Sequence, residues 1–206
     1  MKPDRMMFRA HPWHGVTAGD EAPGVVTCYI EIVPTDTVKY ELDKITGHLT
    51  LERPQHYSNI CPTLYGLVPR TLCGERIAER CRARTGQNIT RADGDPLDIC
   101  VLTEKQIQHG DILLDACPIG GLRMIDNGEA DDKIIAVLRD DLVYGNMRDI
   151  GDCPRAIVDR LIHYFVTYKR SPGSKKPPAS IAEVYDRGEA HETVRLACAD
   201  YVEIYG

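Results

Sequence analysis

Short apolar runs rich in β-branched residues recur along the first two thirds of the chain and predict β-strands. The longest is VVTCYIEIV at residues 25–33. Two shorter β-like runs, at residues 38–42 and 48–52, flank the turn Lys44-Ile45-Thr46-Gly47, so we expect a hairpin there. Three further strands are expected at residues 97–103, 112–117 and 133–138, with Gly110-Asp111, Gly120-Gly121 and Asn127-Gly128 marking the breaks around them.

Two later segments show the helical spacing of apolar residues. Residues 154–168 carry apolar side chains at Ile157, Val158, Leu161, Ile162 and Phe165, and Pro154 suits a first helical turn. Residues 189–204 repeat apolar side chains at steps of three and four. The pattern therefore predicts a mainly β unit of the α+β class, mostly antiparallel, with helices late in the chain.

Residues 71–92 differ from their surroundings. They hold five arginines and two cysteines and show little periodicity, which predicts an inserted surface segment. We expect this segment to serve the surface or assembly of the protein. The alternative is that its arginines contact a substrate.

The composition narrows the class of protein. The length of 206 residues fits one domain, residues 1–206, and a formal net charge of −6 argues against a nucleic acid partner. No stretch approaches the ~20 apolar residues that cross a bilayer, and residues 1–13 lack the apolar core of a signal peptide. We expect a cytoplasmic protein without membrane contact. Its eight cysteines form no Cys-x-x-Cys pair, so free thiols are expected rather than a zinc site.

The strongest chemical signal is the hexapeptide DGDPLD, with carboxylates at Asp93, Asp95 and Asp98. Three carboxylates so close repel one another unless a cation joins them. Hard cations such as Mg²⁺ take oxygen ligands of this kind. The alternatives are an acidic turn that precedes a strand, or a calcium loop, although the EF-hand spacing is absent.

Three other groups complement this loop. A second acidic stretch, residues 126–132, precedes the strand expected at Lys133. Lys39 and Glu41 lie two apart on a strand and so share a face. Tyr168-Lys169 ends the first expected helix. Carboxylates that hold metal ions, together with cations and hydroxyls that bind phosphate oxygens, are what phosphoryl transfer to water requires.

These blocks resemble those of the soluble family I inorganic pyrophosphatases. The family signature D-x-D-P-x-D reads DGDPLD here, E-I-P…K-x-E reads EIVPTDTVKYE, and G-x-L…R reads GHLTLER. The elements Y-G…P…T, D-x4-D-x-K and H-x-F-x-x-Y-K read YGLVPRT, DNGEADDK and HYFVTYK. The six blocks follow the family order across residues 31–169.

The resemblance implies hydrolysis of inorganic pyrophosphate to two orthophosphates by Mg²⁺-activated water, with several Mg²⁺ ions per site. The implied metal ligands are Asp93, Asp98, Asp126 and Asp131. Asp131 is preferred to Asp132 because the family has one residue between this aspartate and the lysine, here Lys133. Asp95 matches the residue that accepts the proton of the attacking water. The implied phosphate contacts are Lys39, Arg53, Tyr65, Lys133, Tyr168 and Lys169, and the supporting acidic residues are Glu31 and Glu41.

The resemblance also implies a small closed antiparallel five-stranded barrel of OB-like type with peripheral helices, and a homo-oligomer. The chain departs from the family pattern at Cys61 and Leu64, in CPTLYG, and Tyr65 and Asp93 are unusually far apart, 93 − 65 = 28 residues. Two other functions remain open. One is hydrolysis of a nucleotide pyrophosphate, although no Walker A or Gly-x-Gly-x-x-Gly motif occurs. The other is non-enzymatic binding of phosphate or metal on the same fold.

Overall fold

The computed structural model of the chain describes residues 9–171, 173 and 179–206. Its strands are β1 (Val26–Ile32), β2 (Val38–Leu42), β3 (Leu49–Pro54), β4 (Leu64–Leu67), β5 (Arg91–Ala92), β6 (Asp98–Leu102), β7 (Ile112–Asp126), β8 (Glu129–Ala130), β9 (Lys133–Leu138) and β10 (Ser180–Asp186). Its helices are α1 (Glu75–Thr85), the short 3-10 helix η2 (Ile150–Asp152), α2 (Arg155–Thr167) and α3 (Arg187–Tyr205). The six strands and two helices expected from the sequence are all present; β2 and β9 have the expected ends, and the ends of the others are shifted.

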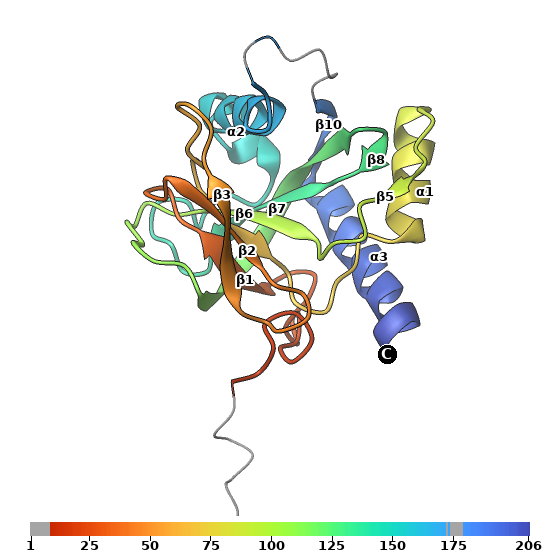
Figure 1. Ribbon diagram of the computed structural model, residues 1–206, viewed down its shortest axis with the longest axis horizontal. Coiled ribbons are helices and arrows are strands. Elements are labelled where there is room, and N and C mark those ends of the chain that lie inside the picture. Colours follow the sequence, from red (N-terminus) through yellow and green to blue (C-terminus); the bar gives the residue numbers. More distant parts are fainter. Residues whose placement is uncertain (1–8, 172, 174–178) are drawn as a thin grey trace, which may run out of the picture.

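Five strands pair in a ring, in the order β1-β4-β6-β9-β7 and back to β1. Four of these five pairings are antiparallel, and β6 runs parallel to β9, with Asp98 opposite Lys133. A ring with an odd number of strands cannot alternate direction all the way round, so at least one pair must be parallel. The antiparallel arrangement expected from the sequence therefore fails at β6–β9. The molecule is a sheet-dominated α+β fold (Figure 1).

Strand β7 is more than twice as long as the segment expected at residues 112–117. Its first part pairs with β1, its middle with β9 and its last part with β10 and β8. Gly120 and Gly121, expected to break the chain, lie inside the strand next to a register shift. A Cβ on Gly121 would lie 2.4 Å from the ring of Tyr185, so this glycine permits close packing of β10 rather than a turn.

The hairpin expected around Lys44 is confirmed. Strands β2 and β3 form a separate two-stranded sheet, in which Lys39 lies opposite Arg53. Gly47 has φ +72°, a left-handed conformation that glycine adopts without strain, and it closes the turn. The hairpin thereby projects two cationic side chains from neighbouring strands.

Helix α1 corrects the expectation for residues 71–92. Ile77, Ala78 and Cys81 of this helix are buried in the same hydrophobic cluster as Val194 and Ala197 of α3. The two helices lie next to each other on one flank of the molecule, near β5, β8 and β10 (Figure 1). The apolar spacing was hard to recognise because charged residues fill the rest of the helix. The segment is therefore part of the core rather than a loop over its surface.

Successive side chains of β6 and β9 point to opposite faces of the sheet, and the two sets pack in separate hydrophobic clusters. Ile99 and Val101 pack in one cluster with β1, α1 and α3, whereas Cys100 and Leu102 pack in a second cluster with Leu161 and Phe165 of α2. Both faces of these central strands are thus covered, which explains their almost continuous apolar sequence. The rigid pair β6–β9 carries Asp98 and Lys133 at its start.

All eight cysteines are free thiols, as expected. None of the helices within the described residues is both long enough and apolar enough to span a membrane.

Candidate active site

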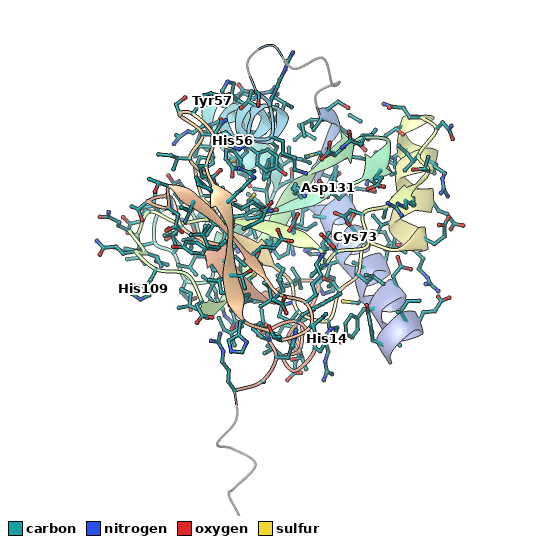
Figure 2. All side chains as sticks on the ribbon, in the orientation of Figure 1. His14, His56, Tyr57, Cys73, His109 and Asp131 are labelled. Carbon is teal, nitrogen blue, oxygen red and sulfur yellow. The ribbon has the colours of Figure 1, made fainter. Side chains whose placement is uncertain are left out.

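A cleft of about 170 Å³ opens where the β2–β3 hairpin faces the turn before β6, the β7–β9 connections and the end of α2. Its lining includes every site residue expected from the sequence except Arg53, namely Glu31, Lys39, Glu41, Tyr65, Asp93, Asp95, Asp98, Asp126, Asp131, Lys133, Tyr168 and Lys169. Asp131 lies near the middle of the molecule (Figure 2). Residues from five of the six motif blocks thus meet in one place.

The floor of the cleft is an ion-paired cluster around Lys133, whose side chain is fully buried. Its ammonium pairs with the carboxylates of both Asp98 and Asp131. Burial lowers the pKa of Lys133, but the two carboxylates outweigh this effect and the net shift is upward, so Lys133 stays charged. Burial raises the pKa of Asp131 in turn, and the ion pair with Lys133 more than offsets it.

The turn before β6 adds two more carboxylates, Asp93 and Asp95, next to Asp98 at the start of the strand. Gly94 has φ +78°, and the backbone N–H of Asp95 donates to Oδ1 of Asp93 at 3.0 Å. The Asp95 side chain is 41% exposed and pairs with Lys44. Burial, followed by the charge of Asp131, raises the pKa of Asp93 to about 9. Burial also raises the pKa of Asp98, and Lys133 opposes that shift. Burial is thus the largest cause of the upward pKa shift of both Asp93 and Asp98.

The hairpin supplies the opposite wall. The ammonium of Lys39 lies 2.7 Å from Glu41 and 2.6 Å from Glu52. Glu31 is buried, accepts a hydrogen bond from the backbone N–H of Leu42 at 2.7 Å, and has its pKa raised to about 8 by burial. Arg53, expected in the site, does not line the cleft. Its guanidinium lies 5.9 Å from the ring centre of Tyr168, which does line the cleft.

The end of α2 contributes hydroxyl and ammonium groups. Tyr168 is the C-cap of the helix, and the next residue, Lys169, pairs with Asp126 at 2.7 Å. The rings of Tyr65 and Tyr168 each pack against Phe165, at centroid distances of 5.9 Å. The packing fixes both phenols while their hydroxyl ends remain at the cleft.

The lining has an excess of negative charge. Eight carboxylates, from Glu31, Glu41, Asp93, Asp95, Asp98, Asp126, Glu129 and Asp131, stand against four ammonium groups, from Lys39, Lys44, Lys133 and Lys169. Oxygen donors in excess over cations are the set that hard divalent ions prefer. Within the described part of the chain, no three acidic, histidine or cysteine side chains already form a cation cage. Lysine ammonium groups lie against Asp95, Asp98, Asp126 and Asp131 instead.

Several residues that line the cleft were not expected from the sequence. Lys44 is the most important, because it pairs with Asp95 from the hairpin turn. Its signal was its position five residues after Lys39 in the same hairpin, but a lysine in a turn is usually solvated. Glu129 and Asn127 also line the cleft. Cys61 and Leu64, the two departures from the family pattern, are buried in the core and do not line it.

Comparisons with known proteins found similar sequences and similar structures. The family model described as inorganic pyrophosphatase matches residues 28–202. The inorganic pyrophosphatase of Chlamydia muridarum is 52% identical over 199 residues, which cover 95% of each chain. The soluble inorganic pyrophosphatase of Oryza sativa subsp. indica is 41% identical over 79% of this chain and 67% of its own. The crystal structure of inorganic pyrophosphatase from Thermus thermophilus superposes with a TM-score of 0.78 at 30% identity, covering 94% of this chain and 99% of that one.

Proposed function

The chain belongs to the inorganic pyrophosphatase family, and on that premise we propose that its acidic cleft hydrolyses pyrophosphate with the help of several Mg²⁺ ions. The enzyme converts inorganic pyrophosphate to two orthophosphates and requires a divalent metal. The observation that carries the proposal for the cleft is its charge balance of eight carboxylates against four ammonium groups. Such a cleft repels a polyanion unless divalent cations enter with it.

The metal ligands in this proposal are Asp93, Asp98, Asp126 and Asp131, whose oxygens suit Mg²⁺. Bound Mg²⁺ would acidify a water molecule and neutralise charge on the phosphoryl oxygens. Glu31 and Glu41 support these ligands from β1 and β2. Lys133 pairs with Asp98 and Asp131, and Lys169 pairs with Asp126. When a metal cation binds these carboxylates instead, both ammonium groups become available to phosphate oxygens.

Asp95 is the proton acceptor in this proposal. It is the most accessible of the three carboxylates in its turn to a water that enters from solvent, with 41% of its side chain exposed against 20% for Asp98. The phosphate groups are held by Lys39, Tyr65, Lys133, Tyr168 and Lys169. Arg53, 5.9 Å from the ring centre of Tyr168, is proposed as a further phosphate contact. Cationic and phenolic donors of this kind stabilise the leaving phosphate.

The proposal extends to the whole molecule. The chain forms one domain over residues 1–206, whose ring of five strands closes as a small barrel of OB-like type. Eight free thiols suit the reducing cytoplasm. The family relationship favours a homo-oligomer.

A nucleotide substrate is the second candidate, and the size of the cleft argues against it. Its volume of about 170 Å³ is below the roughly 300–1,000 Å³ of sites for larger organic ligands. The test is phosphate release from pyrophosphate, tripolyphosphate and ATP, with Mg²⁺, with Ca²⁺ and after chelation.

We expect turnover of pyrophosphate with Mg²⁺, little turnover of ATP, and inhibition by Ca²⁺, which is larger and tolerates irregular geometry. Preferential turnover of ATP would favour the nucleotide reading. Absence of turnover with tight Mg²⁺ or phosphate binding would favour a binding protein. Full activity after chelation would contradict the metal mechanism.

A further inference from the structure

Arg123, on β7, is the largest side chain that is fully buried in the described structure. Its guanidinium pairs with three carboxylates: Glu189 of α3 at 2.6 Å, Glu183 of β10 at 2.7 Å and Asp132 at 3.4 Å. It also lies 5.0 Å from the ring centre of Tyr185. A buried guanidinium is costly unless its donors are paired, so these contacts are interdependent.

Helix α1 completes this group of charges. Arg80 donates from Nε to Oε1 of Glu189 at 2.8 Å, and its Nη2 donates to the other carboxylate oxygen. Arg84, one turn later, donates to both oxygens of Glu183. The group therefore brings together three arginines and three carboxyl groups. Arg80 and Arg84 thus pair with these carboxylates, and neither lines the cleft.

Asp132 connects the group to the active site. It lies between Asp131 and Lys133, whose side chains pair with each other in the cleft. Side chains of successive residues in an extended chain point to opposite sides. Asp132 accordingly turns away from the cleft, with only 2% of its residue surface exposed. Among the residues that the structure describes, Arg123 is the side chain that pairs with it.

We propose that Arg123 is a positioning residue, which through Asp132 holds the Asp131–Lys133 segment with its carboxylate and ammonium aimed into the cleft. Arg80 and Arg84 fix Glu189 and Glu183, and thereby hold the guanidinium in place. Helix α1 thus influences the cleft from a distance. The contacts run from α1 to the carboxylates of β10 and α3, from these to Arg123, and from Arg123 to Asp132. This inference rests on the proposed role of Asp131 in binding Mg²⁺.

The geometry explains why an arginine stands here. A single guanidinium has donors in a fixed planar fork, so it can hold carboxylates from β10, α3 and the segment before β9 at once. The pair with Arg123 anchors the backbone at Asp132, and a shift of that backbone would move Asp131 and Lys133 with it. The orientation of the Asp131 and Lys133 side chains is therefore tied to this buried pair.

The test is Asp132→Asn, which keeps the shape of the side chain and removes its charge. Mg²⁺ binding is measured by titration calorimetry without substrate, together with kcat, KM and the unfolding temperature of the metal-free protein. We expect Mg²⁺ binding about tenfold weaker, the loss typical when a group that orients a metal ligand is altered. The rate should recover in part at high Mg²⁺ concentration.

The matched control is Asp159→Asn, which removes a carboxylate that pairs with Arg155 on the exposed face of α2. It should leave Mg²⁺ binding and turnover unchanged. Arg80→Gln is the second variant, in case Asp132→Asn does not fold, and it should weaken Mg²⁺ binding in the same direction by a smaller factor.

A folded Asp132→Asn or Arg80→Gln protein with a lower unfolding temperature but unaltered Mg²⁺ binding and kcat/KM would overturn the positioning role. Failure of the proposed function itself is distinguishable. In that case the unsubstituted protein would bind no Mg²⁺, or would hydrolyse pyrophosphate without it.

Discussion

At the residue scale, the carboxylates of the DGDPLD turn differ in their surroundings. Asp98 shares the buried ammonium of Lys133 with Asp131, whereas Asp95 faces Lys44 at the rim of the cleft. A group held in a buried ion pair is poorly placed to move a proton. A partly exposed carboxylate next to an ammonium can accept one from a water. The turn therefore separates a proton-accepting position from metal-holding positions within six residues.

This difference predicts the behaviour of Asp95→Asn. The variant should keep its fold and most of its Mg²⁺ binding, since Asp95 is not among the proposed ligands. Its kcat should fall by about 10²–10⁴, the usual contribution of a general base. Steady-state kinetics near neutral pH, with calorimetric Mg²⁺ binding as the companion measurement, checks this outcome. A kcat close to that of the unsubstituted enzyme would remove Asp95 from its role.

The residues that meet in the cleft were largely predictable from motif spacing. The one-residue interval before Lys133 selected Asp131 over Asp132, and the structure places Asp131 in the cleft and Asp132 against Arg123. Lys44 and the buried partners of Arg123 were not predictable. Their function depends on which side chains the fold brings opposite them, and local sequence carries no record of that.

At the element scale, helix α1 shows how charged residues hide an amphipathic pattern. Ile77, Ala78 and Cys81 are buried, but five arginines in residues 71–92 gave that segment the composition of a solvated loop. Three of those arginines pair with acidic residues of α3 and β10. The ring of strands likewise could not be predicted from the local sequence pattern, because its pairings join residues that lie far apart in the chain. Strand existence follows from local pattern, whereas closure of the ring does not.

The packing of α1 predicts a stability effect. Ile77→Ala should destabilise the protein by about 2–4 kcal/mol, because it removes a fully buried side chain and leaves a cavity. Glu79→Ala, at an exposed position of the same helix, should change stability by less than about 0.5 kcal/mol. Urea unfolding measures both.

Because the buried face of α1 is part of the core, replacing residues 72–90 by a Gly/Ser linker should unfold the domain. An intact, stable deletion variant would contradict the assignment of this helix to the core.

The contact between α1, β7 and α3 predicts a pH dependence. Burial raises the pKa of Glu189, but hydrogen bonds from Arg80 and Arg123 outweigh it and lower the pKa to about 2. A lowered carboxyl pKa stabilises the folded state above the unfolded value near 4.3, and that stability is lost as the pH falls toward 2. Glu189→Gln should therefore cost about 2–3 kcal/mol at pH 7.

The difference between Glu189→Gln and the unsubstituted protein should shrink below about pH 4. Unfolding in urea at pH 7, 5 and 3.5 gives the comparison. A difference that is constant over this range would show that the carboxylate is not held in its ionised form by the two arginines.

At the scale of the whole molecule, charge is unevenly distributed. The chain carries a formal net charge of −6, and the lining of the cleft alone has four more carboxylates than ammonium groups. The metal-free protein relieves this repulsion in two ways. Lysines pair with several of the carboxylates, and others keep their protons, as the pKa values of about 9 for Asp93 and about 8 for Glu31 indicate. Divalent cations compete with both.

Mg²⁺ binding should therefore stabilise the fold and release protons. A carboxyl whose pKa is raised is protonated at pH 7, and it must ionise before it can act as a ligand or stand beside one. Apparent Mg²⁺ affinity should then rise between about pH 6 and pH 9, and proton release should fade above that range because the carboxyls have already ionised. At a free Mg²⁺ concentration of 100 times Kd the stabilisation should approach about 2.7 kcal/mol.

Calorimetric titration at pH 7 in two buffers of different ionisation enthalpy measures the protons released. Thermal unfolding at matched ionic strength in NaCl separates specific Mg²⁺ binding from charge screening. Equal heats in the two buffers at pH 7 would show that the cleft is already fully ionised, and the raised pKa values of Asp93 and Glu31 would then be wrong.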